Sequence, residues 1–135
     1  MSETTVHVFG IVPGSIGEEI GYGYPFWHPK PVNGTDEEII EWEDMNPKWG
    51  LREEIGELDE DEVVSFLNKD DRVWRNLEFY IREDGDVDRI KEIASHCKEF
   101  ILIFDLGHEP GSVDYRSTEG ALYAGEFISY YNPKR

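Results

Sequence analysis

Short stretches of apolar residues predict several β-strands. Residues 4–12 have two largely apolar faces, which predicts a strand in the interior of a sheet. Residues 100–106 form an unbroken apolar run of strand length and are the best candidate for the central strand. Residues 73–82 alternate apolar side chains with more polar ones, so they predict a further strand.

Other stretches have the periodicity of helices. A Thr-Asp-Glu-Glu capping box, with Thr35 as N-cap, predicts a helix over residues 36–44. Residues 60–68 contain an apolar stripe at helical spacing and predict a second, short helix. A third helix is expected over residues 87–98, with Asp86 as its N-cap and one continuous apolar face.

The order of these elements suggests a fold class. A strand, a helix and a strand follow one another with short connections, which predicts a βαβ unit over residues 73–106 with parallel strands and a right-handed crossover. We therefore expect a single compact α/β or α+β domain over residues 1–135. Its mixed sheet should have about five strands, accompanied by about three helices.

Two regions leave alternatives open. Residues 121–131 fit either a strand or a helix, and their aromatic content with Gly125 inside favours a bent strand. Residues 13–35 predict a loop rich in glycine, proline and aromatic residues. The aromatics of this loop either attach it to the core, which is the favoured interpretation, or form a contact surface for a partner.

Composition places the chain among globular proteins. It has 135 residues, of which 39% are hydrophobic and 13% aromatic, so it can bury a core. It shows no apolar run of about 18 residues and no signal peptide, which leads us to expect a cytoplasmic protein without a membrane partner. Cys97 is the only cysteine, so it cannot form an internal disulfide.

Negative charge is concentrated in residues 36–62, which we call the acidic segment. It holds 13 Asp or Glu and two bases, a charge of −11 out of −17 for the chain. Acids in the first turns of two expected helices have a local explanation, because they favour the positive end of the helix dipole. The remaining acids do not, and such charge repels nucleic acid and anionic lipid but attracts basic proteins.

These patterns predict a binding surface for a basic partner. Trp42 is expected to be a core residue on the face of the first helix, whereas Trp49 is expected to be an exposed anchor. The predicted partner-binding residues are Tyr22, Tyr24, Trp27, Glu41, Glu43, Asp44, Trp49, Glu53, Glu54 and Glu57.

An alternative site follows the expected central strand. Asp105, His108 and Glu109 could form a carboxylate–imidazole site at the end of residues 100–106, near Glu83 and Asp84 if the neighbouring strand is parallel. The spacing of these residues forces no single geometry. No other catalytic, metal-binding or cofactor-binding pattern stands out, so we expect no catalytic residue, no metal and no cofactor.

In size, acidity and aromatic content the chain is similar to immunity proteins that neutralise nuclease toxins, and to phage inhibitors that mimic nucleic acid. No motif accompanies this similarity in composition. The predicted function is a non-catalytic acidic binding or inhibitor protein whose partner is basic, such as a nuclease toxin or another nucleic-acid-binding protein. The alternative is a small enzyme or ligand-binding protein. The oligomeric state stays open.

Overall fold

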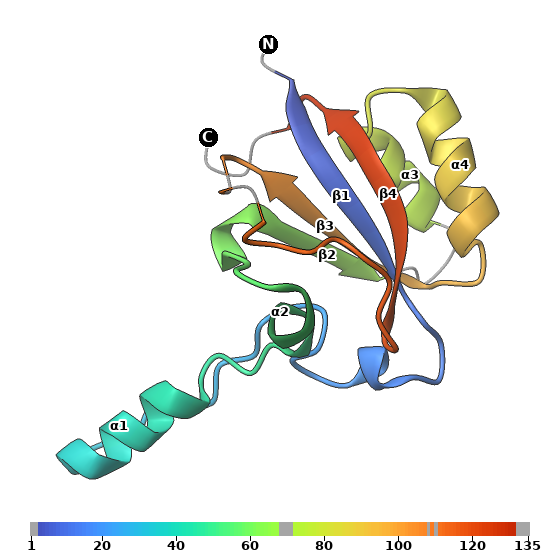
Figure 1. Ribbon diagram of the computed structural model, residues 1–135. Coiled ribbons are helices and arrows are strands. Elements are labelled where there is room, and N and C mark those ends of the chain that lie inside the picture. Colours follow the sequence, from blue (N-terminus) through green and yellow to red (C-terminus); the bar gives the residue numbers. More distant parts are fainter. Residues whose placement is uncertain (1–2, 68–71, 108, 110, 132–135) are drawn as a thin grey trace.

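One antiparallel sheet forms the centre of the molecule (Figure 1). The computed structural model describes residues 3–67, 72–107, 109 and 111–131. Within them the sheet has four strands in the order β2-β3-β1-β4, and each neighbouring pair is antiparallel. The strands are β1 (Thr4–Ile11), β2 (Val63–Leu67), β3 (Glu99–Asp105) and β4 (Ala121–Ser129).

The two inner strands are those with the most continuous apolar sequence. β1 and β3 lie side by side, with Val8 opposite Leu102, and both of these residues are fully buried. The strands predicted from residues 4–12 and 100–106 are therefore confirmed. The bent strand favoured for residues 121–131 is also confirmed, because β4 shifts its register against β1 near Gly125, whose φ of 125° favours glycine.

Two helices cover one face of the sheet, α3 (Arg72–Tyr80) and α4 (Asp84–Ala94) (Figure 1). Leu77 and Ile90 of these helices are fully buried and pack in one cluster with residues of β1 and β3. α4 begins before the expected N-cap, since Glu83 takes that position and Asp86 lies in the first turn, paired with Arg89. Cys97, just beyond this helix, is buried in the same cluster.

The opposite face of the sheet is covered mainly by loops and one short helix. α2 (Gly50–Ile55) packs its Leu51 and Ile55 against Phe9 and Ile101 of the inner strands. Two short 3-10 helices, Ile16–Glu18 and Glu60–Glu62, flank this layer. None of the helices in the described part of the chain is long and apolar enough to cross a membrane.

The predicted βαβ unit over residues 73–106 is wrong. Residues 73–82 form mainly helix α3, because Val73, Leu77 and Ile81 follow a helical spacing and are all buried, whereas Phe79 is 72% exposed. The helix predicted over residues 60–68 is replaced by a single 3-10 turn followed by β2. The fold class is thus a mixed α+β domain with one antiparallel sheet, and the sheet has four strands where about five were expected.

Candidate binding surface

Residues 27–47 project from the body of the protein, and we call them the arm (Figure 1). An antiparallel bridge closes the base of the arm, where Phe26 and Lys48 exchange two backbone hydrogen bonds of 2.9 and 2.8 Å. The arm contains helix α1 (Asp36–Met45), which confirms the helix predicted there. Thr35 is its N-cap, as expected, and its side chain accepts a hydrogen bond from the backbone of Glu38.

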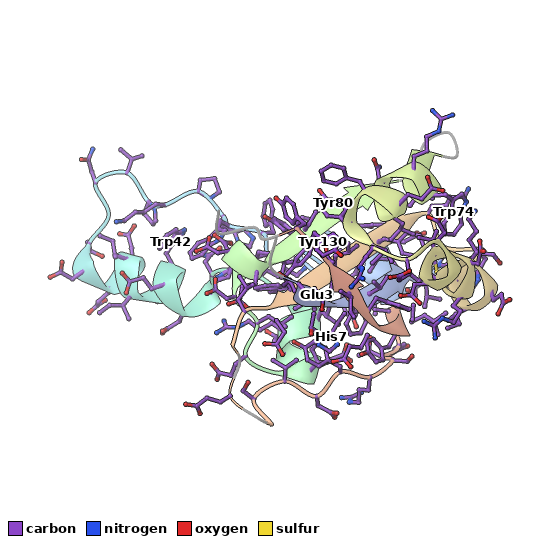
Figure 2. All side chains as sticks on the ribbon, turned by 90° about the horizontal axis from the view of Figure 1, so that it is seen from above. Glu3, His7, Trp42, Trp74, Tyr80 and Tyr130 are labelled. Atoms are coloured by element: carbon purple, nitrogen blue, oxygen red, sulfur yellow. The ribbon has the colours of Figure 1, made fainter. Side chains whose placement is uncertain are left out.

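The arm has internal contacts of its own. The indole nitrogen of Trp42 donates to the carbonyl oxygen of His28 at 2.8 Å, and the rings of Trp42 and Trp27 lie 5.8 Å apart. The side chain of Asn46 accepts from the backbone of His28 and donates to the carbonyl of Trp42. Trp42 is therefore not a residue of the main core, contrary to the interpretation favoured from sequence (Figure 2).

Helix α1 buries none of its residues. Its acidic side chains are all exposed: Asp36, Glu37, Glu38, Glu41, Glu43 and Asp44. Two of its apolar side chains are also exposed, Ile40 by 56% and Met45 by 63%. A helix of this length is marginally stable in water without tertiary packing. The arm therefore presents a charged surface with apolar side chains that the other described residues leave exposed.

A hollow of about 730 Å³ lies between the foot of the arm and the body, and we call it the acidic groove. The arm contributes Trp27 and Pro47, and Trp27 donates from its indole nitrogen to Glu60 at 2.9 Å. Arg52 is the single Lys or Arg among the described residues that line it. Its acidic lining residues are Glu57, Asp59, Glu60, Asp61, Glu62 and Glu109.

The structure separates the predicted partner-binding residues into two groups. Tyr24 and Trp27 are 42% and 47% exposed at the base of the arm. The acids of the set are exposed on α1, on α2 and just after it: Glu41, Glu43, Asp44, Glu53, Glu54 and Glu57. A second hollow of about 340 Å³, bordering the acidic groove, brings Asp44, Glu53 and Glu57 together. These side chains are accessible to a partner.

Trp49 and Tyr22 form the second group, and both belong to the core. Trp49 is 3% exposed and donates from its indole nitrogen to the carbonyl oxygen of Gly23 at 3.0 Å. Tyr22 is 5% exposed, and its hydroxyl donates to Glu54. Burial, together with the Glu54 carboxylate, raises the pKa of Tyr22. The expectation that Trp49 is an exposed anchor is thus wrong, because it fills the layer beneath the arm.

The structure describes two of the three alternative catalytic residues, Asp105 and Glu109. Asp105 is half-buried, and its Oδ1 accepts a hydrogen bond from the backbone of Gly107 at 3.0 Å. Glu109 lines the acidic groove, and His108 lies outside the described residues. Glu83 and Asp84 begin helix α4 and do not end a parallel strand, so the expected edge of adjacent parallel strands does not exist.

Sequence reasoning missed a polar cluster on the sheet. His7 of β1 is 5% exposed and stacks on Tyr115, with ring centroids 3.4 Å apart. Its Nδ1 lies 2.9 Å from the hydroxyl oxygen of Tyr123. Burial raises the pKa of Tyr123 to about 12, and burial with the nearby Asp105 and Glu62 carboxylates raises that of Tyr115 further. The alternation of side-chain directions along the predicted strand placed His7 on one face of it. No sequence pattern linked His7 to tyrosines more than a hundred residues away.

The acidic side chains of the arm and the acidic groove are spread over several elements of the chain. Among residues 3–67, 72–107, 109 and 111–131, no group of three or more His, Cys, Asp or Glu side chains is placed to hold a metal ion. Apart from Glu62, which is 5% exposed, the acids of the arm and groove are exposed. Such a surface can contact an extended cationic surface. Comparison with protein-family models, curated proteins and solved structures gives no match to this chain.

Proposed function

We propose that this chain is a non-catalytic binding or inhibitor protein that engages a basic partner protein through the arm and the acidic groove. The observation that supports this most is helix α1, which exposes all six of its carboxylates and buries no residue. Such a helix contributes little to the core of its own domain. Its conformation and charge are therefore best explained by contact with another molecule.

Charge supplies attraction and orientation. The net charge of −17 is concentrated near the arm, so the electrostatic field of the protein has a strongly negative side. A basic protein that approaches this side gains in association rate, and the gain falls as salt screens the charges. Anionic lipid and free nucleic acid are repelled by the same field, so a protein partner fits better than either.

Apolar contacts supply the remaining affinity. Ile40 and Met45 on α1 and Trp27 at its base are all exposed, and each is next to carboxylates of the arm or groove. Exposed charge pairs alone contribute only about 0–1 kcal/mol each. Aromatic and aliphatic anchors that become buried at an interface contribute more. The combination favours specific binding over general attraction between opposite charges.

Charge reversal on the arm tests the proposal. The full chain is immobilised and incubated with a lysate of its source, and basic proteins retained by the wild type are identified by mass spectrometry. The test variant carries Glu41→Lys, Glu43→Lys and Asp44→Lys, three exposed positions of α1. We expect it to lose the retained protein, because the steering field and the contact surface are both altered.

A matched control separates arm charge from total charge. Glu78→Lys, Asp88→Lys and Glu92→Lys change the net charge by the same amount at exposed positions of α3 and α4. This control should retain the partner at nearly the wild-type level. Equal loss in both variants would mean that only overall charge matters. Unchanged retention by the arm variant would remove the proposal.

A small enzyme or ligand-binding protein is the second candidate. The observation in its favour is the cluster of His7, Tyr115 and Tyr123 beside Asp105, which combines a buried imidazole with two hydroxyl groups and a carboxylate. Such groups can act as general acids or bases. Binding of small-molecule fragments that shifts the NMR signals of the His7 ring would support this candidate. Fragments that shift only signals of the arm would count against it.

A further inference from the structure

We infer that the arm occupies a nucleic-acid-binding groove of its partner and competes there with nucleic acid. This inference rests on the proposed function and specifies which surface of a basic protein is engaged. Helix α1 has ten residues and therefore a length of about 15 Å. Six of those residues are acidic and none is basic, which gives one negative charge per ~2.5 Å of helix axis.

That charge density is close to the density of nucleic acid. Duplex DNA has one negative charge per ~1.7 Å of axis for both strands together, and one per ~3.4 Å for each strand. α1 lies between these two values, and all its carboxylates are exposed. A groove whose lysines and arginines are spaced to neutralise a phosphate backbone therefore meets a similar charge per unit length on the arm.

The carboxylates are also arranged in a row. Glu37, Glu41 and Asp44 are spaced i, i+4 and i+7, so they lie along one face of α1 with axial separations of about 4.5–6 Å. Trp42 points to the other side, where its indole contacts the His28 carbonyl. The row therefore faces away from the internal packing of the arm, with the exposed Ile40 beside it.

The shape of the molecule allows entry into a groove. The arm is attached to the body through the Phe26–Lys48 bridge and extends beyond it as a narrow projection (Figure 1). A projecting helix can enter a channel that a compact domain could only cover. Ile40 and Met45 then add apolar contacts that a phosphate backbone does not offer, which lets a short arm compete with a longer polymer.

The experiment uses the full chain and the basic protein that it retains. The purified partner is mixed with a fluorescently labelled DNA duplex, or with labelled single-stranded RNA, and the chain is added while fluorescence anisotropy is recorded. We expect the chain to displace the nucleic acid in proportion to the amount of chain–partner complex formed. The variant Glu37→Gln, Glu41→Gln and Asp44→Asn should need a concentration about tenfold higher or more, because the charged row is neutralised.

A control variant tests whether displacement depends on the carboxylates of the arm. Neutralising Glu78, Asp88 and Glu92 of α3 and α4 should leave displacement at the wild-type level. A partner that binds nucleic acid and the chain at the same time overturns this inference. A partner that binds neither the DNA duplex nor the single-stranded RNA overturns it as well. The proposed function survives both of these results. If the wild type retains no basic protein, both the inference and the proposed function fall.

Discussion

Deleting the arm should leave the fold intact, and this prediction follows directly from the finding that α1 buries no residue. Residues 27–47 are replaced by Asn-Gly, so that Phe26 and Lys48 close a two-residue hairpin. The two backbone hydrogen bonds between these residues have the geometry of a closing pair, at 2.9 and 2.8 Å. The core layer below, including Trp49, is unchanged by this deletion.

The expected change in stability can be worked from the contacts. The deletion removes the hydrogen bond from Trp27 to Glu60, which is exposed and contributes about 1 kcal/mol at most. It also shortens the loop about tenfold, which lowers the entropic cost of closure by up to about 2 kcal/mol. No residue of α1 is buried, so no core term is lost. The free energy of unfolding should stay within about 2 kcal/mol of the wild-type value.

Urea unfolding followed by tryptophan fluorescence measures this change, because Trp49 and Trp74 remain as probes. A matched control is Leu51→Ala in α2, which removes a fully buried side chain and should cost about 2–5 kcal/mol. If the arm deletion destabilises the protein as much as this control does, the arm is an integral part of the core. The interpretation of α1 as a docking element would then be wrong.

Three further predictions concern the core and its titrating groups. Trp49→Ala should lower the free energy of unfolding by about 3–5 kcal/mol, whereas Trp42→Ala should leave the urea midpoint of the body unchanged; similar losses would contradict the assignment of Trp49 to the core and Trp42 to the arm. The pKa of Tyr123 is about 12 in the folded protein, above its ordinary value of 10.0. Between these pH values the unfolded chain loses this proton and the folded protein keeps it, so stability should fall as pH rises. Tyr123→Phe should flatten that fall in thermal melts, and an unchanged slope would refute the assignment. The Cys97 thiol is buried, and burial raises its pKa, so it should react with a thiol reagent slowly in buffer and rapidly in urea; fast native labelling would show that the site opens.

The inner strands and the capped helix could be predicted from sequence because their patterns have a single interpretation. Residues 4–12 and 100–106 are apolar on both faces, which suits only an interior strand. The Thr35 capping box has a local hydrogen-bond pattern that does not depend on the rest of the fold. Both kinds of pattern are determined by neighbouring residues, so tertiary context did not alter them.

The stretch 73–82 was mispredicted because it fits two periods. Leu77, Phe79 and Ile81 alternate as in a strand, while Val73, Leu77 and Ile81 repeat as in a helix. The alternation of apolar with more polar side chains led to the strand prediction. Packing against the sheet selected the helix, leaving Phe79 exposed. Because residues 73–82 form a helix, they cannot pair in parallel with residues 100–106, and the observed sheet is antiparallel.

Charge could be located from sequence, but burial of the aromatics could not. Most acids of residues 36–62 are exposed, as expected for carboxylates, whereas Glu62 is buried by the fold. Trp42 was assigned to the core and Trp49 to the surface. In the structure Trp42 is half-buried against other residues of the arm, whereas Trp49 is 3% exposed. Trp49 lies where a loop returns to the sheet, next to Leu51. That return is a long-range feature which no local pattern encodes.

The central claim is that the arm recognises a basic partner through its carboxylates. The measurement that tests it most directly is the association rate constant with the retained partner, recorded at increasing salt concentration. For the wild type we predict fast association that slows steeply with salt, as expected for electrostatic steering. The variant Glu41→Lys, Glu43→Lys and Asp44→Lys should associate slowly, with little dependence on salt. Equal rates and equal salt dependence for the two proteins would contradict the claim.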